Sequence, residues 1–238
     1  SLMRYGRQAF TSRIALADLA QKSIDVQYYI WEQDATGRIL AERLSRAAER
    51  GVRVRVLIDD ANLAYLDAAV ASFDAHPNIE VRLFNPFHTR SANLLVKAWH
   101  ALQDHVRLNR RMHNKVFIAD NQIGITGGRN IGDEYFEAHQ DLSFVDLDIV
   151  AAGAIVDNLS QSFDQYWNSD AAVPASALPI IAKDSRLLRV TRFLQQFHAR
   201  KLDTDYGRAL ASADPLPGLL AGNIPWHLAR ADLIVDPP

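Results

Sequence analysis

The segment HNKVFIADNQIGITGGRN combines a titratable ring, a fixed cation, two adjacent glycines and a side-chain amide. If this segment opens with a strand, side chains two positions apart share a face, so His113 and Lys115 would point to the same side. Gly127 and Gly128 would let a substrate oxygen approach backbone N–H groups, and Asn130 would add a side-chain donor. An imidazole beside cationic and amide donors is the set of groups that cleavage of a phosphodiester needs.

Each of these residues also has a structural explanation when it is taken alone. Asp120 would be a turn former, Lys115 a solvated edge residue, and the two glycines a bulge. A single histidine on a strand is more often structural than catalytic, and that default applies to the remaining ones: His76, His88, His100, His105, His139, His198 and His227. The joint spacing H-x-K-x4-D-x6-G-G-x-N is the stronger signal and favours a functional site.

Helical and strand-like segments alternate on both sides of this spacing. Apolar residues recur at helical spacing in 8–23, 36–51, 61–76 and 154–169, and runs rich in β-branched and aromatic residues occupy 24–32, 52–60, 79–86 and 143–151. Two more strands are expected around a turn at Asp120 and Asn121. This alternation predicts an α/β fold in which a mixed β-sheet is sandwiched between α-helices.

The apolar stripe in residues 91–106 favours a helix packed on the core over a helix that contacts a membrane. After Ser169 the composition changes. DAAVPASALP indicates a linker or surface loop, residues 184–201 a helical piece, and ADLIVDPP an apolar strand-like run. We therefore expect one domain in residues 1–169, which carries the polar motif, and a linker with a helical extension in residues 170–238.

Composition excludes several classes of site. The 26 basic and 28 acidic residues give a formal net charge of −2, which offers no strong attraction for nucleic acid or an anionic membrane. The absence of cysteine excludes disulfides, thiolate metal ligands and a cysteine nucleophile. Because the apolar runs are too short to span a membrane, we expect this chain to be soluble.

The spacing around His113 resembles the signature of the phospholipase D superfamily, the HKD motif followed by a glycine-rich G-x-N. The likeness extends through YIWEQDATGRILAERLSRAAERGVRVRVLIDD, GGRNIGDEYF and SFDQYWNS, and it is closest to the first half of a bacterial cardiolipin synthase. It implies a phospholipase D-like half domain. One departure is Gly128, where many members have serine, and this removes one hydroxyl from the phosphate shell.

The resemblance implies a role for each motif residue. His113 matches the nucleophilic histidine, and Lys115 and Asn130 match the residues that bind the non-bridging oxygens. Asp120 matches the motif aspartate, and its place at a turn favours a supporting role. Asp146 occupies the position of the carboxylate that orients the histidine.

The resemblance leaves other positions with alternatives. Asp148 is the alternative to Asp146 as the orienting carboxylate. Arg111 would be either a second cation for the substrate or a surface residue. Gly127 and Gly128 would contribute to substrate binding through their backbone. Three carboxylates near strand ends are expected to support the pocket walls by hydrogen bonds rather than to bind a metal: Asp34, Asp59 and Asp60.

In this superfamily two HKD motifs face each other and work without a metal or an organic cofactor. One histidine attacks phosphorus and the other protonates the leaving alkoxide, which gives a phosphohistidine intermediate. This sequence has one H-x-K. Either two copies of the chain pair, or the chain is a fragment of a longer two-motif enzyme and is inactive alone. The likeness of ADLIVDPP to the first strand of a second half favours the fragment.

The resemblance implies phosphatidyl transfer in a bacterium, with the full-length enzyme at a membrane surface. The donor would be phosphatidylglycerol, alone or with phosphatidylethanolamine, and the second motif would come from the same longer chain. Hydrolysis, as in a phospholipase D, is the nearest alternative. A homodimeric nuclease is less favoured because the basic residues are dispersed, so no nucleic acid partner is expected. A non-catalytic membrane scaffold is least favoured, because the motif residues are intact.

Overall fold

The computed structural model describes residues 1–62, 67–87, 111–139, 141–178 and 226–238. The helix expected at 91–106 and the helical piece expected at 184–201 lie outside these residues. In chain order, the α-helices and strands of the described residues are β1 (Leu2–Met3), α1 (Gly6–Leu19), β2 (Ser23–Tyr28), α2 (Ala35–Glu49), β3 (Arg53–Asp59), α3 (Asp67–Asp74), β4 (Ile79–Phe84), β5 (Val116–Ala119), β6 (Ile123–Gly127), β7 (Asp148–Ala152), α6 (Ala154–Trp167) and β8 (Ala172–Pro174).

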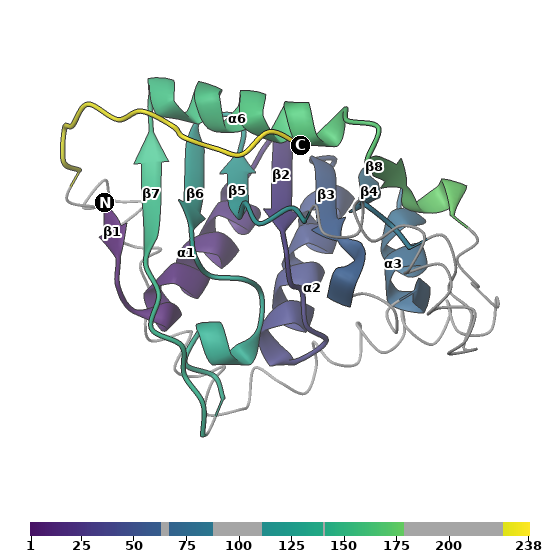
Figure 1. Cartoon of the computed structure of the whole chain (residues 1–238). Coiled ribbons are helices and arrows are strands. Elements are labelled where there is room, and N and C mark those ends of the chain that lie inside the picture. The colour runs from purple at the N-terminus through teal and green to yellow at the C-terminus, as the bar shows by residue number, and fades with distance from the viewer. Residues whose placement is uncertain (63–66, 88–110, 140, 179–225) are drawn as a thin grey trace.

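The strands of the described residues form one mixed sheet in the order β1-β7-β6-β5-β2-β3-β4-β8. β2, β3 and β4 run parallel, and all other neighbouring strands are antiparallel. Helices α2 and α3 make the crossovers between the parallel strands, as parallel pairing requires. The alternating pattern of the sequence therefore gives the predicted mixed sheet (Figure 1).

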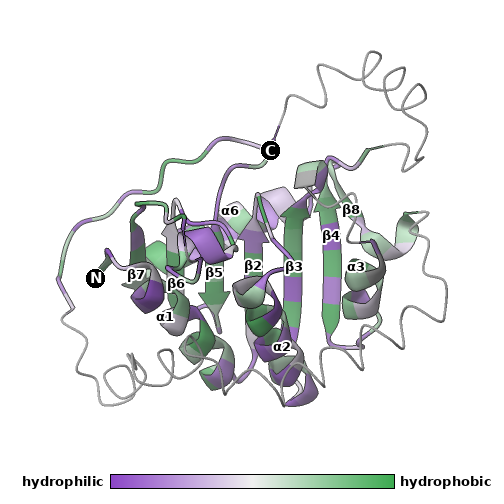
Figure 2. Ribbon diagram, turned by 90° about the horizontal axis from the view of Figure 1, so that it is seen from below, coloured by the Kyte–Doolittle hydropathy of each residue, from purple (hydrophilic) through white to green (hydrophobic). Residues whose placement is uncertain are grey.

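Helices cover both faces of the sheet (Figures 1 and 2). Helices α1, α2 and α3 pack on one face and α6 on the other, so alternate strand residues enter two separate cores. The first core includes Phe10, Val26, Leu40 and Val54, and the second includes Val116, Ile118, Leu159 and Phe163. This arrangement confirms the predicted α/β sandwich. No helix in the described part of the chain is long and apolar enough to cross a membrane.

Strands β5 and β6 form the predicted hairpin. Its two central residues, Asp120 and Asn121, both have a φ of +54°, and the Gln122 N–H donates to the Ala119 carbonyl oxygen at 3.0 Å. Positive φ at both central positions is the turn geometry that matches the twist of antiparallel strands, and aspartate and asparagine tolerate it better than most residues. The hairpin fixes the position of the chain on either side of the glycine pair.

Three strand boundaries predicted from the sequence were wrong. The strand expected at 24–32 ends at Tyr28, as β2. The hairpin begins at Val116, so His113 and Lys115 precede the strand, and just before them the Met112 N–H donates to the side chain of Asp59. β7 begins at Asp148, so the expected strand from residue 143 starts later. The Leu147 N–H donates to the Asp146 carboxylate, a local bond that competes with strand pairing.

The C-terminal part also departs from the prediction. Residues 172–174, expected within a linker, form β8, which pairs with β4 at the edge of the sheet. An edge position tolerates Pro174, which has no N–H to donate. Residues 226–238 contain neither helix nor strand, so the strand expected in ADLIVDPP is absent from this segment. The segment instead runs along α6 (Figure 1).

Candidate active site

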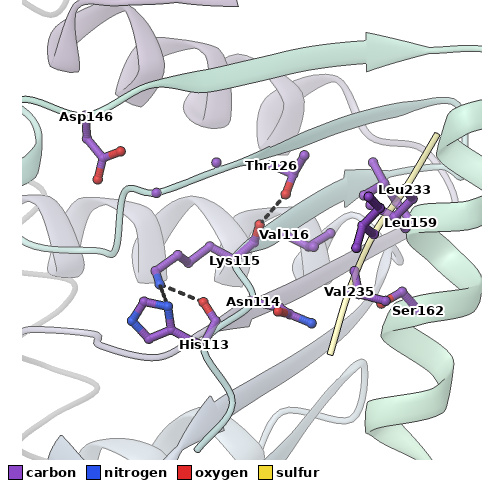
Figure 3. A pocket seen from close by; sticks show the side chains of 13 residues that line it. His113, Asn114, Lys115, Val116, Thr126, Asp146, Leu159, Ser162, Leu233 and Val235 are labelled. Carbon is purple, nitrogen blue, oxygen red and sulfur yellow. Dashed lines mark hydrogen bonds between the residues drawn. The ribbon is translucent and has the colours of Figure 1, made fainter. Parts of the chain in front are cut away.

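A cavity of about 330 Å³ opens where β2 and β6 end and where β5 and β7 begin. In open α/β sheets this carboxyl-end edge of the parallel strands is the usual location of a ligand site. One end of the cavity is polar and the other is largely apolar (Figure 3). The polar end is formed by His113, Lys115, Gly127, Gly128 and Asp146, and the apolar end includes Val116, Leu159, Leu233 and Val235.

His113 and Lys115 are in contact at the polar end (Figure 3). Lys115 Nζ lies 3.2 Å from His113 Nδ1 and donates to the His113 carbonyl oxygen at 2.6 Å. The ring of Tyr29 lies beside both, 5.3 Å from the His113 ring and 5.9 Å from Nζ. Lys115 is 4% exposed, whereas His113 is exposed. The two side chains therefore meet as predicted, although both precede the strand.

Charge and burial favour a neutral His113. Although the side chain of His113 is exposed overall, partial desolvation of its ring and the Lys115 charge lower the pKa of His113, and the carboxylates of Asp236 and Asp59 oppose them. Burial also lowers the pKa of Lys115, with an opposing effect from Asp146. Because an ammonium group only donates, its contact with Nδ1 requires this nitrogen to accept. The proton of the neutral ring is thereby assigned to Nε2.

Asp59, at the end of β3, holds the segment that precedes His113. Its carboxylate is fully buried and accepts from Arg111 Nη1 at 3.0 Å, from Met112 N at 3.0 Å and from Ala61 N at 2.9 Å. Burial raises the pKa of Asp59, while these donors and the Arg111 charge oppose the rise. Arg111 is thus part of an ion pair with Asp59, and its contact with a substrate stays a prediction.

Asn130 braces two loops. Its Oδ1 accepts from Ile30 N at 3.1 Å, and its Nδ2 donates to the Tyr135 hydroxyl at 3.1 Å. The bond with Ile30 joins the segment after β6 to the segment after β2, and the bond with Tyr135 lies within the segment after β6. Asn130 is buried and does not line the cavity around His113. Its contact with a substrate oxygen stays a prediction.

Asp146 lies over Gly128 and acts electrostatically on Lys115. Within the described residues, no hydrogen bond joins it to His113, and its carboxylate accepts from the Leu147 N–H at 2.8 Å. It lines the same cavity as His113 (Figure 3). Its role in orienting a histidine stays a prediction.

The glycine pair makes room for the start of β7. A Cβ on Gly127 would overlap the Leu147 carbonyl oxygen and Asp148, and a Cβ on Gly128 would overlap the Asp146 carboxylate. The Gly128 N–H donates to the Leu147 carbonyl oxygen at 3.2 Å, so this donor is already used. The pair therefore has a packing function, while its contribution to substrate binding stays a prediction.

Asp120 lies at the end of β5 remote from His113. Its carboxylate accepts from the backbone N–H groups of Gln21, Lys22 and Ser23 at distances between 2.7 and 3.2 Å. It therefore fastens the connection between α1 and β2 to the hairpin. This structural position is in keeping with the supporting role that its place at a turn suggested.

Sequence reasoning missed a buried charge network behind the cavity. Asp148 forms an ion pair with Arg13 at 2.9 Å, and both side chains are at most 1% exposed. Arg129 lies 3.7 Å from the same carboxylate and donates to the backbone oxygens of Met3 and Arg4. Successive side chains of a strand point to opposite faces of the sheet, and the side chain of Asp148 points to the face that α1 covers, not toward His113. The sequence contained one sign of this network, because the charged residue Arg13 lies within a run of apolar residues at helical spacing.

Other acidic residues near the site also act as hydrogen-bond acceptors. Asp34 caps α2 by accepting from Gly37 N at 2.9 Å, and it also accepts from the backbone N–H of Asp133. Asp60 accepts from Phe87 N at 2.8 Å. In the part of the chain that the structure describes, no group of three or more histidine or acidic side chains is arranged to hold a metal ion. The carboxylates of Asp34 and Asp60 are thus occupied by backbone donors, and their expected support of the pocket walls stays a prediction.

Residues 14–167 match the family model described as cardiolipin synthase, phospholipase D-like domain. The chain belongs to this family. Its phospholipase D-like domain includes every residue of the HKD motif, from His113 to Asn130. The resemblance found in the sequence is therefore confirmed.

Two relatives indicate how much of a cardiolipin synthase the chain represents. It is 40% identical over 230 residues to cardiolipin synthase C of Escherichia coli K12, covering 97% of this chain and 48% of that protein. It is 36% identical over 235 residues to an uncharacterized protein of Helicobacter pylori J99, covering 90% and 46%. The chain thus spans about half the length of the curated relatives it matches.

Two solved structures share the fold of this phospholipase D-like domain. NucT from Helicobacter pylori has a TM-score of 0.54 at 17% identity, and the match covers 73% of this chain and 97% of that chain. Phosphatidylserine synthase of Haemophilus influenzae has a TM-score of 0.54 at 15% identity, covering 83% and 43%. At these identities the likeness shows the fold alone.

Proposed function

We propose that this chain supplies one half of the active site of a phosphatidyl transferase, which exchanges the alcohol of a phospholipid through a phosphohistidine intermediate. The observation that carries the proposal is the contact between His113 and Lys115 at the polar end of a cavity whose other end is apolar. Membership of the cardiolipin synthase family supports a phospholipid donor. This donor is phosphatidylglycerol, alone or with phosphatidylethanolamine, at a membrane surface.

The first step requires Lys115 to change partner. While its ammonium donates to Nδ1, the proton of the His113 ring stays on Nε2, and that nitrogen cannot attack. An anionic phosphodiester attracts the ammonium to its non-bridging oxygens, which accumulate charge as phosphorus becomes five-coordinate. Nδ1 can then take up the proton and Nε2 becomes the nucleophile. The pair therefore couples binding of the phosphate to activation of the histidine.

The full exchange needs a second histidine. The Nε2–P bond forms as the P–O bond to the first alcohol breaks, and the leaving alkoxide takes a proton from that second histidine. An acceptor alcohol then loses its proton to the second histidine and attacks phosphorus, which breaks the P–N bond. A second HKD motif in the same longer polypeptide is the proposed source, so the isolated chain is expected to be inactive.

The test compares the complete native gene product with its His113→Ala and Lys115→Met variants on phosphatidylglycerol in mixed micelles. We expect product formation to fall by about three orders of magnitude or more for His113→Ala, and by about two to three for Lys115→Met. His76→Ala, in the loop after α3, is the matched control and should stay within about twofold. Radiolabelled donor should leave an acid-labile phosphoryl group on the native enzyme.

The 238-residue chain is assayed alongside. Undiminished product from His113→Ala would overturn the proposed role of this site. Product from the short chain itself would mean that two copies complete the site, as in a homodimeric phosphodiesterase. Release of free phosphatidic acid without any transfer product would instead identify a phospholipase D hydrolase.

A further inference from the structure

The segment Leu233–Asp236 lies in the same cavity as His113. Leu233, Ile234 and Val235 line the cavity, and Leu233 is partly buried against the core beneath α6 (Figure 3). The Tyr166 hydroxyl donates to the Asp236 carbonyl oxygen at 2.8 Å and fastens the segment to α6. The chain therefore places its own apolar side chains beside the candidate catalytic pair.

The surface beneath this segment is apolar and uncharged. Val116 and Leu159 form most of it, and Asn114 and Ser162 add neutral polar groups. None of the described residues that line this end of the cavity carries a formal charge. A phosphate would be favoured at the Lys115 end, whereas this end suits hydrocarbon. The two ends of the cavity thus match the two parts of an alkyl phosphate: the polar end suits the phosphate and the apolar end suits the alkyl chain.

Among the described residues, the segment is weakly held. Residues 226–238 pair with no strand there, and Tyr166 supplies their hydrogen bond to the rest of the fold. Ile234 and Leu228 are almost fully exposed, so they contribute little packing. A segment held by one hydrogen bond and a few apolar contacts can be displaced by a ligand that makes better contacts.

We propose that the apolar end of the cavity binds the alkyl portion of the phosphodiester substrate, and that Leu233–Asp236 is a displaceable strap covering this end. The inference rests on the proposed function, because it places the phosphate at His113 and Lys115. The strap and the alkyl chain present the same chemistry to Val116 and Leu159, so they exclude each other. With the strap in place, the remaining volume of about 330 Å³ accommodates a phosphate and the first methylenes, and a longer alkyl chain reaches Val116 and Leu159 only when the strap is displaced.

The experiment measures binding of methyl phosphate and hexyl phosphate to the 238-residue chain by NMR of the His113 ring. Tyr166→Phe keeps the buried ring and removes the hydroxyl that holds Asp236 and that also hydrogen-bonds the Asn114 side chain, an effect that methyl phosphate reports separately. It should bind hexyl phosphate about fivefold more tightly, which corresponds to one ordinary hydrogen bond lost by the strap. Its affinity for methyl phosphate, which does not reach the apolar end, should stay within about twofold.

A second variant checks the result in case Tyr166→Phe has an effect on the core that is unrelated to the strap. Leu233→Ser/Val235→Ser weakens the strap without changing α6 and should also bind hexyl phosphate more tightly, while Leu228→Ser, on an exposed part of the same segment, should not. Unchanged or weaker hexyl phosphate binding in both strap variants, with methyl phosphate still bound, would overturn the strap alone. Failure of both phosphates to perturb His113 in the unaltered chain would overturn the proposed phosphate site and the strap together.

Discussion

Lys115 Nζ lies 3.2 Å from Nδ1 of His113, so the ammonium charge acts directly on the protonation of the ring. Burial and this charge lower the pKa of His113. Lys115→Met should therefore raise the pKa of His113. In the complete enzyme, the rise of activity with pH that reports a neutral histidine should move to higher pH. The pKa is measured by NMR titration of the ring, with signals assigned from a His113→Gln variant.

Lys22→Met is the matched control for this titration. Lys22 follows α1 at the opposite end of the sheet, and its Nζ charge is not among the influences on His113. Its removal should leave the pKa of His113 unchanged. A His113 pKa that moves equally in both lysine variants would show a general charge effect and would contradict direct coupling within the pair.

Asp59→Asn should destabilise the fold and disturb His113. The substitution removes a buried charge that pairs with Arg111, and an amide group would face at least one of the backbone donors of Ala61 and Met112. We expect the free energy of unfolding in urea to fall by about 2–4 kcal/mol. The His113 ring signals should also shift, because Asp59 holds Arg111 and Met112 directly before His113.

An exposed ion pair provides the comparison for Asp59. Asp18 pairs with Arg43 at 3.1 Å, and both side chains are partly exposed. Asp18→Asn should change the free energy of unfolding by less than about 1 kcal/mol and leave the His113 signals in place. Equal losses for the two variants would mean that Asp59 is not the anchor of the segment before His113.

The fold could be predicted from the sequence because its helices and strands depend on patterns within a few consecutive residues. RVRVLID alternates charged and apolar residues before a run of three apolar residues, 56–58, and it forms β3 between two parallel neighbours. The turn at Asp120 and Asn121 was readable because few residues tolerate a positive φ. In both cases the information lies within a few consecutive residues.

The details of the site were not readable because they depend on contacts between distant segments. Met112 donates to Asp59 across 53 positions, and this bond holds the segment that precedes His113. The pair of Arg13 and Asp148 joins the first helix to the last long strand, and it removes Asp148 from the candidates for orienting His113. No periodicity in the sequence indicates which residue, distant along the chain, will pair with a buried charge.

Asp120→Asn should reduce stability in a pH-dependent manner. Burial would raise the pKa of Asp120, but three backbone N–H donors and the Lys22 charge outweigh it, so the pKa is lowered. The stabilisation by the carboxylate is therefore present above the unfolded pKa of about 3.9 and is lost as pH falls through the folded pKa. At pH 7 the variant should lose about 1 kcal/mol of unfolding free energy, and the difference should shrink at acid pH.

Asparagine is the suitable replacement at this turn because it tolerates the φ of +54°. Unfolding in urea is followed by circular dichroism at neutral and acid pH. Asp170→Asn, an exposed position outside the hairpin, should show little difference from the native chain at either pH. A loss at Asp120 that stays constant across the pH range would rule out the carboxylate charge as its source.

Gly127→Ala and Gly128→Ala should differ in cost although the two glycines are adjacent. The new Cβ at Gly127 would overlap the backbone at Leu147, which cannot move without separating β6 from β7, and we expect a loss of about 2–4 kcal/mol. The new Cβ at Gly128 meets the Asp146 carboxylate, a side chain that can rotate away, so the loss should stay below about 1 kcal/mol. Urea unfolding measures both.

A double substitution tests whether Asp146 is the source of the smaller cost. In the background of Asp146→Ala, the Gly128→Ala change should become nearly neutral because its overlapping carboxylate is gone, whereas Gly127→Ala should keep its full cost. Among the described glycines, positive φ occurs at Gly51 and Gly153, so backbone strain does not explain a loss at either member of the pair. If Gly128→Ala remained as costly without the carboxylate as with it, the close approach of Asp146 could not be what requires glycine there.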